Sequence, residues 1–237
     1  MKLRACGAVL GLAVALLGHT ACAQPAEHSV AASLHPTITF DFVRNVAGAP
    51  VPKYTLTIHQ DGTANYAGEA APPTTRYGPP ASTEAIPFQR ELHLTATTTA
   101  HIFDLAGQLD HFKRDCASSA KNIADTGTKT FSYNGLDAQG SCTYNYTEIK
   151  ELASLTQVIQ GIAETLDFGR ELARLHRYDR LGLDPAMISL TQEVKDGRAL
   201  EIGTIGDTLR GIAEDPDVLA RVRSKASALL VQAALAQ

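Results

Sequence analysis

The sequence predicts an α+β fold, in which an antiparallel β-sheet with a packed helix is followed by a C-terminal helical bundle. Between residues 36 and 148, apolar residues mainly alternate with polar ones, which is the period of strands that bury one face. After Glu148 the apolar residues recur with the period of an amphipathic helix, and they do so to the end of the sequence. We therefore expect a sheet with one helix over residues 36–148, and a helical region over residues 149–237 that packs on the sheet or follows it.

The first two strands are each predicted by three alternating apolar residues, which are Ile38, Phe40 and Phe42, and then Tyr54, Leu56 and Ile58. Asp61-Gly62 then signals a hairpin turn. A two-residue turn would leave Tyr66 on the polar face of the third strand. A three-residue loop that ends at Gly62 instead pairs Leu56 with Tyr66, so we prefer this bulged turn.

A long exposed loop is expected at residues 70–87, where Pro, Thr, Ser and Ala dominate. The strand after this loop contains Leu92 and Leu94, which alternate with polar residues. Arg76 and Tyr77 at its centre are candidate contact residues, because binding residues are often carried on loops. In the alternative, which we favour, the loop is a mobile insertion.

A helix over residues 99–112 follows, because four apolar residues fall on one of its faces: Ile102, Leu105, Leu109 and Phe112. Two further strands are expected at residues 128–134 and 141–147. In the second of these, Cys142, Tyr144 and Tyr146 share one face, which we expect to be buried.

The helical region begins with a long amphipathic helix whose apolar face contains Leu152, Leu155, Ile159, Ile162 and Leu166. Gly161 and Gly169 mark places where this helix bends or packs closely. Asp184-Pro185 and Asp215-Pro216 each predict an N-cap followed by the first residue of a helix. Gly197, between them, is expected to end a helix.

The first 23 residues have the pattern of a signal peptide. Lys2 and Arg4 precede an apolar run over residues 5–17, and small residues then surround a cleavage point before Gln24. The alternative is a lipoprotein signal in which Cys22 carries the lipid. Both alternatives predict an exported protein, either periplasmic or secreted, with a flexible mature terminus at residues 24–35 and no transmembrane span in the mature chain.

Removal of this leader lowers the basic count from 21 to 19 against 25 acidic residues, so the mature net charge is −6. This balance argues against nucleic acid or an anionic membrane as the partner. Of four cysteines, Cys116 and Cys142 remain, and in an oxidising compartment we expect them to form a disulfide. A reactive thiol and two unpaired thiols are the alternatives.

The most distinctive candidate site lies late in the first long helix. Arg170, Arg174 and Arg177 recur at i, i+4 and i+7, and His176 and Arg180 lie close by, so this face could offer forked donors to an anionic group or partner. In the alternative, which we favour, Asp167 pairs with Arg170 and Glu171 pairs with Arg174 as structural ion pairs. If the chain has a binding site, this face is our first choice.

The sequence predicts no catalytic residue, no metal site and no cofactor. It lacks the motifs of zinc hydrolases, phosphate loops, dinucleotide-binding turns and serine-hydrolase elbows.

A family resemblance rests on four segments, which are the strand from Tyr54 to Ile58, the turn Asp61-Gly62 with Tyr66-x-Gly68, a helix ending in Phe112, and the hairpin Phe131-x-Tyr133-Asn134-Gly135. In this order they resemble a bacterial secreted domain of unknown function over residues 36–166. The whole mature chain resembles uncharacterised exported proteins of acidobacterial type. The resemblance implies the fold outline and export, and it transfers no catalytic residue.

These observations favour a non-enzymatic exported protein that binds a protein or glycan partner through the exposed sheet, loop 70–87 or the arginine-bearing helix. The alternative is a hydrolase-like enzyme with a site assembled from distant residues such as His93, Asp104 and His176. A deep pocket with converging polar groups would favour the enzyme, and a shallow surface would favour binding.

Overall fold

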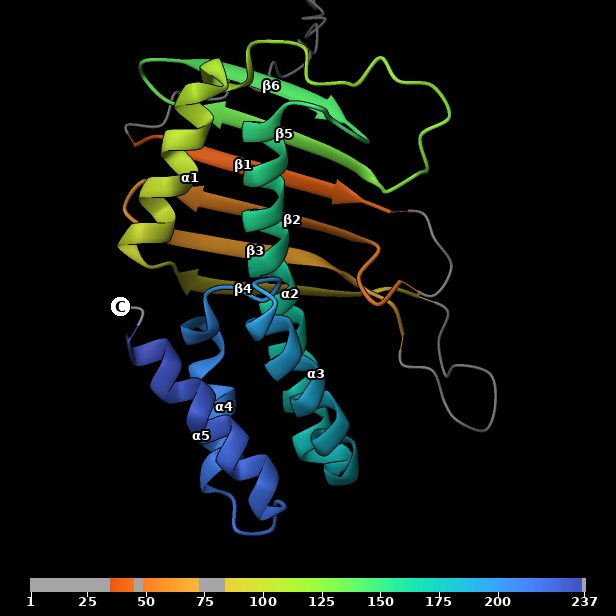
Figure 1. Ribbon diagram of the computed structural model, residues 1–237, viewed down its shortest axis with the longest axis vertical. Helices are drawn as coiled ribbons and strands as arrows, with labels where there is room; N and C mark the ends of the chain where they lie inside the picture. Colours follow the sequence, from red (N-terminus) through yellow and green to blue (C-terminus); the bar gives the residue numbers. More distant parts are fainter. Residues whose placement is uncertain (1–34, 45–48, 73–83, 236–237) are drawn as a thin grey trace, which may run out of the picture. The chain divides into compact units, whose positions relative to one another are not determined.

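The computed structural model describes residues 35–44, 49–72 and 84–235. Six strands form one antiparallel sheet in the order β4-β3-β2-β1-β5-β6 (Figure 1). Their bounds are β1 Thr37–Val43, β2 Lys53–His59, β3 Thr63–Ala70, β4 Ile86–His93, β5 Thr128–Asn134 and β6 Gln139–Tyr144. Helices complete a mixed α+β fold with a C-terminal helical region, so the predicted fold class is confirmed. The predicted signal peptide and residues 24–34 lie outside the described residues.

One face of the sheet is apolar and covered by helices. Alternate residues of β1 and β2 are buried, as the period-2 pattern predicts. The helices α1 (Ala96–Gln108) and α2 (Lys150–Tyr178) lie across this face (Figure 1). Phe112, which follows α1, stacks on Phe131 of β5 with ring centroids 5.1 Å apart. The core therefore sits between the sheet and these two helices.

The predicted register of the first hairpin is confirmed. Leu56 pairs with Tyr66 and Ile58 pairs with Ala64. Gly62 has a φ of +86°, the left-handed conformation that the bulged turn requires and that glycine adopts without strain.

Three element boundaries differ from the predictions. β3 ends at Ala70 and β4 begins at Ile86, so strands occupy both ends of the predicted loop 70–87, and residues 73–83 lie outside the described part. Pro87 is tolerated there because β4 is an edge strand. β6 ends at Tyr144, so the predicted burial of Tyr146 is wrong: its side chain is half exposed.

The helix predicted at residues 99–112 is shifted toward the N-terminus. It begins at Ala96, because the Thr95 hydroxyl caps it by accepting a hydrogen bond from the Thr98 amide. It ends at Gln108, and the chain then passes through Asp110, His111 and Phe112 with positive φ angles of 51°, 53° and 64°. This reversal still buries Phe112 completely.

The helical region begins with α2 and continues with α3 (Leu183–Lys195), α4 (Gly206–Glu214) and α5 (Ala220–Leu235), with short 3-10 turns between them. Its first helix packs on the sheet, where the Tyr66 hydroxyl donates to Asp167 of α2 at 3.0 Å. The later helices pack around the second half of α2, beyond the β4 edge of the sheet (Figure 1). No helix in the described ranges is long and apolar enough to cross a membrane.

Close packing explains both glycines of α2. A Cβ atom on Gly169 would lie 2.3 Å from the Ile205 side chain, and one on Gly161 would lie 2.9 Å from the carbonyl oxygen of Arg198. Gly197 has a φ of +69° just after α3, which confirms the predicted helix end.

The two predicted Asp-Pro caps are wrong. α3 begins at Leu183, so Asp184 lies inside its first turn, and its carboxylate pairs with Arg221 of α5 at 2.9 Å. Asp215 ends α4 instead of beginning a helix, and it accepts a hydrogen bond from the Asp217 amide. The carboxylate that an N-cap would need is engaged by a residue distant in sequence at Asp184 and by a turn at Asp215.

The predicted disulfide is confirmed. Cys116 and Cys142 are joined with an S–S distance of 2.10 Å and a Cα–Cα distance of 5.7 Å. Cys142 lies on β6, and Cys116 lies in the segment that follows α1, so the bond ties this segment to an edge of the sheet.

Candidate functional site

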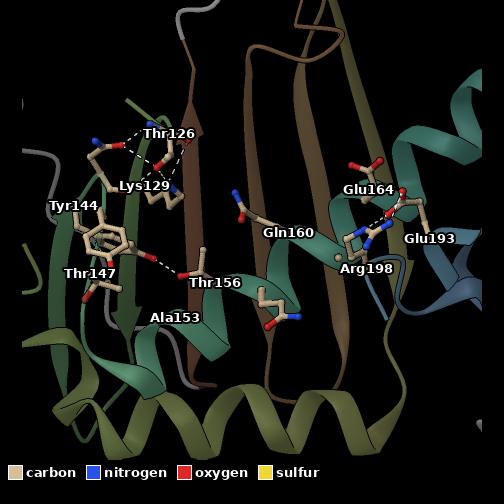
Figure 2. A pocket seen from close by; sticks show the side chains of 14 residues that line it. Thr126, Lys129, Tyr144, Thr147, Ala153, Thr156, Gln160, Glu164, Glu193 and Arg198 are labelled. Carbon is tan, nitrogen blue, oxygen red and sulfur yellow. Dashed lines mark hydrogen bonds and ion pairs between the residues drawn. The ribbon is translucent and has the colours of Figure 1, made fainter. Parts of the chain in front are cut away.

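The first candidate site is a groove of about 510 Å³ that runs along one side of α2 (Figure 2). The β5–β6 region provides one end, with Thr126, Lys129 and residues 144–147. α2 provides a wall with Ala153, Thr156, Gln157, Gln160, Gly161 and Glu164, and Glu193 and Arg198 form the other end. We refer to these residues as the α2 groove.

The spacing of its residues explains why α2 can form the wall. Ala153, Gln157, Gln160 and Glu164 follow one another at intervals of four, three and four, which places them on one helix face. The apolar residues that the sequence analysis assigned to α2 occupy its core face and are all buried. The same amphipathic pattern thus anchors α2 and aims its polar face at the groove.

Lys129 lines one end of the groove with a side chain that is buried in the protein. Its side chain is only 5 % exposed. The ammonium group donates hydrogen bonds to the carbonyl oxygens of Gly127 and Asn145 and to the Thr126 hydroxyl, at 2.9 to 3.0 Å. Burial lowers the pKa of Lys129, and the charge of Asp125 opposes this shift. Because its three donors are occupied, Lys129 holds the loop and is not available to a ligand.

The neighbouring wall is fixed by a short chain of hydroxyl groups. Tyr144 is hydrogen bonded to Thr156, and the Thr156 hydroxyl donates to the Leu152 carbonyl oxygen at 2.6 Å. Burial raises the pKa of Tyr144, so its hydroxyl stays protonated over the whole physiological range. This chain links the end of β6 to the first turns of α2.

The middle of the groove presents polar groups without a partner. Gln157, Gln160 and Glu164 form no hydrogen bond or ion pair within residues 35–44, 49–72 and 84–235. Partial burial and then the neighbouring Glu193 raise the pKa of Glu164, and Arg198 opposes this shift. Figure 2 shows Gln160 between the Lys129 end and the cluster of Glu164, Glu193 and Arg198.

At the far end of the groove, neighbouring carboxylates balance the positive charge of Arg198. Arg198 donates to Glu193 at 2.5 and 3.0 Å and to Asp196 at 2.7 Å. Its guanidinium group is therefore engaged by two carboxylates. Glu164 is left as a charged group of the groove that has no direct ionic partner in the described residues.

The predicted arginine face contains the ion pairs of our favoured interpretation. Arg170 lies 3.3 Å from Asp167, and Arg174 binds Glu171 with two hydrogen bonds of 2.7 and 2.8 Å. The Arg170 guanidinium also lies over the Phe88 ring, 4.5 Å from its centroid. These two arginines are thus engaged by neighbours on α2 and on the sheet.

The other three residues of this candidate site lie near the end of α2. His176 and Arg180 share the Asp215 carboxylate, at 2.8 and 3.1 Å, and Arg180 also reaches Asp217 at 3.3 Å. Arg177 lies over the Tyr178 ring, 5.2 Å from its centroid, and has no carboxylate partner in the described part of the chain. Anion binding by this face stays a prediction.

A second pocket, of about 350 Å³, lies between the β2–β3 turn and α1. It brings together His93 and Asp104, two of the three residues considered for a distant enzyme site, and adds Asp61. His176 does not line it and is instead hydrogen bonded to Asp215 near the end of α2. The structure therefore assembles only part of that grouping.

The α2 groove was not predicted from the sequence. Its one available signal is the polar stripe Gln157, Gln160 and Glu164, and any solvated helix face has such a stripe. This stripe lines a groove only because residues 126, 129 and 144–147 and Arg198 lie beside it in the folded protein. No local pattern of the sequence encodes that arrangement.

Comparison of the chain with protein-family models, with curated proteins and with solved structures finds no match. The resemblance to bacterial secreted domains therefore stays a prediction.

Proposed function

We propose that the mature chain is an exported, non-enzymatic binding protein of the periplasm or cell envelope, and that a glycan or protein partner docks in the α2 groove. The observation that carries this proposal is the row of Gln157, Gln160 and Glu164. These three polar side chains line one pocket and have no partner within the described residues. Specific ligand sites typically combine a concave wall with a few such polar groups.

The rigidity of the groove supports the same proposal. Lys129 fixes the loop at one end, and the hydrogen bond between Tyr144 and Thr156 fixes β6 to α2. Walls that are already ordered lose little conformational entropy when a partner docks, so more of the contact energy remains as affinity.

Two further observations support export. The signal-peptide pattern at residues 1–23 addresses the chain to an export pathway. The bond between Cys116 and Cys142 is compatible with an oxidising compartment outside the cytoplasm.

Binding by the groove is tested with the mature protein and isolated envelope fractions. We expect the wild-type protein to sediment with the glycan or protein fraction of the envelope. The double variant Gln157→Ala/Gln160→Ala should weaken this binding at least about tenfold, because two hydrogen-bonding side chains are lost, at roughly 1 kcal/mol each.

Gln108→Ala is the matched control for this experiment. Gln108 is an exposed glutamine at the end of α1 that lines neither pocket. Equal binding by wild type, double variant and control would overturn the assignment of the groove.

Export is tested by N-terminal sequencing, where an unprocessed chain confined to the cytoplasm would contradict it.

A hydrolase-like enzyme is the second candidate, because His93 and Asp104 line one pocket. A panel of chromogenic ester, glycoside and peptide substrates tests it. Turnover by the wild type that is lost in His93→Ala would favour the enzyme, and turnover that is equal in both proteins would exclude this pocket as its site.

A further inference from the structure

The charge of the α2 groove selects against anionic ligands. Its two basic residues are both engaged, Lys129 by neutral oxygens and Arg198 by Glu193 and Asp196. Glu164 adds a negative charge that no direct ionic partner in the described part balances. A phosphate or carboxylate group entering the groove would thus meet like charge without a free cation to offset it.

The hydrogen-bonding groups suit a ligand that is rich in hydroxyl groups. Each carboxamide of Gln157 and Gln160 offers both a donor and an acceptor, and a sugar hydroxyl also acts as both. With Glu164 these groups extend over about 10 Å of helix, as the rise of 1.5 Å per residue gives. That length suits a short oligosaccharide better than a single sugar.

An aromatic ring completes this set of groups. Tyr146 lines the groove, and its side chain is 46 % exposed. Its carbonyl oxygen accepts a hydrogen bond from the Ser118 amide at 3.2 Å, so the backbone that carries the ring is held in place. A flat, partly exposed tyrosine provides apolar area for the C–H face of a sugar ring.

A peptide fits this groove less well. Peptides that dock beside a strand rely on free main-chain groups for their hydrogen bonds. The carbonyl oxygens of Asn145 and Tyr146, which follow β6 at the groove, already accept hydrogen bonds from Lys129, Thr126 and Ser118. These two carbonyl oxygens are therefore already engaged where a docked peptide backbone would need acceptors.

We propose that the ligand of the α2 groove is a neutral oligosaccharide, stacked on Tyr146 and hydrogen bonded by Gln157, Gln160 and Glu164. This inference rests on the proposed binding function and names its ligand class. The groove volume of about 510 Å³ falls within the usual range for small-ligand sites, which is about 300–1,000 Å³.

Calorimetric titration of the mature protein tests the ligand class. The probes are the neutral trisaccharides cellotriose, maltotriose and tri-N-acetylchitotriose, the anionic tri-galacturonate, and a neutral hexapeptide. We expect at least one neutral trisaccharide to bind with a Kd below about 1 mM, and tri-galacturonate to bind at least tenfold more weakly. Failure of all three neutral sugars to bind would overturn the inference.

Variants of groove residues separate the contribution of the Tyr146 ring to sugar binding from that of the Glu164 charge. Tyr146→Ala should weaken sugar binding at least tenfold, whereas Tyr146→Phe, which keeps the ring, should stay within about threefold of wild type. Glu164→Gln should narrow the gap between tri-galacturonate and the neutral sugars. Sugar binding that none of these variants alters would place the site elsewhere and refute the inference.

The outcomes also distinguish this inference from the proposed function. If the hexapeptide binds and Gln157→Ala/Gln160→Ala removes that binding, the groove is a partner site but the sugar assignment is wrong. If neither the probes nor the envelope fractions give binding that depends on Gln157 and Gln160, both proposals fail.

Discussion

Asp167 provides a sharp test of how α2 lies on the sheet. Its carboxylate accepts a hydrogen bond from the Tyr66 hydroxyl and lies beside Arg170. Burial nevertheless raises the pKa of Asp167 from 3.8 to about 6, because removal from water disfavours the charged form more than these two partners favour it. The folded protein therefore holds this proton more tightly than the unfolded chain does.

The sign of the effect on stability follows from this difference. Below the unfolded pKa of 3.8 the protonated Asp167 contributes its full stabilisation, and this contribution is lost as the pH rises through about 6. A shift of about two pKa units corresponds to roughly 3 kcal/mol. The free energy of unfolding should thus fall by up to this amount between pH 4 and pH 8 because of Asp167.

The assay is urea denaturation of wild type and Asp167→Asn at intervals from pH 4 to pH 8. Other carboxylates contribute equally to both proteins, so the difference between them isolates Asp167. We expect the variant to gain stability relative to wild type as the pH rises. Asp207→Asn, at a side chain that is 97 % exposed, is the control. A difference between wild type and Asp167→Asn that does not change with pH would refute the reasoning.

Two further stability predictions use the same denaturation assay. Replacing Cys116 and Cys142 with Ala should cost about 3.5 kcal/mol, the value that the chain-entropy model gives for their loop, and an unchanged midpoint would contradict a structural role for the bond. Gly169→Ala should cost about 1–3 kcal/mol, because its Cβ would meet Ile205 at 2.3 Å. Gly107→Ala, whose Cβ meets nothing within 4 Å, should be neutral or stabilise by up to about 1 kcal/mol, and equal effects of both glycine variants would contradict the packing of α2.

The sheet was predictable because its signals are local. Alternation of apolar residues identifies the buried face of β1 and β2, and a one-residue shift would have exposed Tyr66, so the register of the hairpin follows from the turn at Gly62. The disulfide was predictable for a different reason. The predicted cleavage after residue 23 would remove two of the four cysteines, which leaves Cys116 and Cys142 as a single possible pair, and these two are joined.

The helix ends were less predictable because tertiary contacts override local signals. Asp184 has the sequence context of an N-cap, yet α3 starts before it and Arg221 from α5 binds its carboxylate. The reversal after Gln108 uses three residues with positive φ that have no glycine among them, so no turn signal announces it.

The candidate site shows the same limit. The ion pairs of Arg170 and Arg174 were predictable because both partners lie three residues away on one helix. The α2 groove joins residues 126–147 to α2 and to Arg198, and only the assembled fold brings these segments together.

The most direct test of the proposed function is an NMR titration that follows side chains of the α2 groove. In isotope-labelled mature protein, the side-chain amide signals of Gln157 and Gln160 should shift in a saturable way when the soluble glycan or protein fraction of the envelope is added, and the signal of Gln108 should not. Saturable binding that leaves the Gln157 and Gln160 signals unchanged would contradict the proposal that the partner docks in the α2 groove.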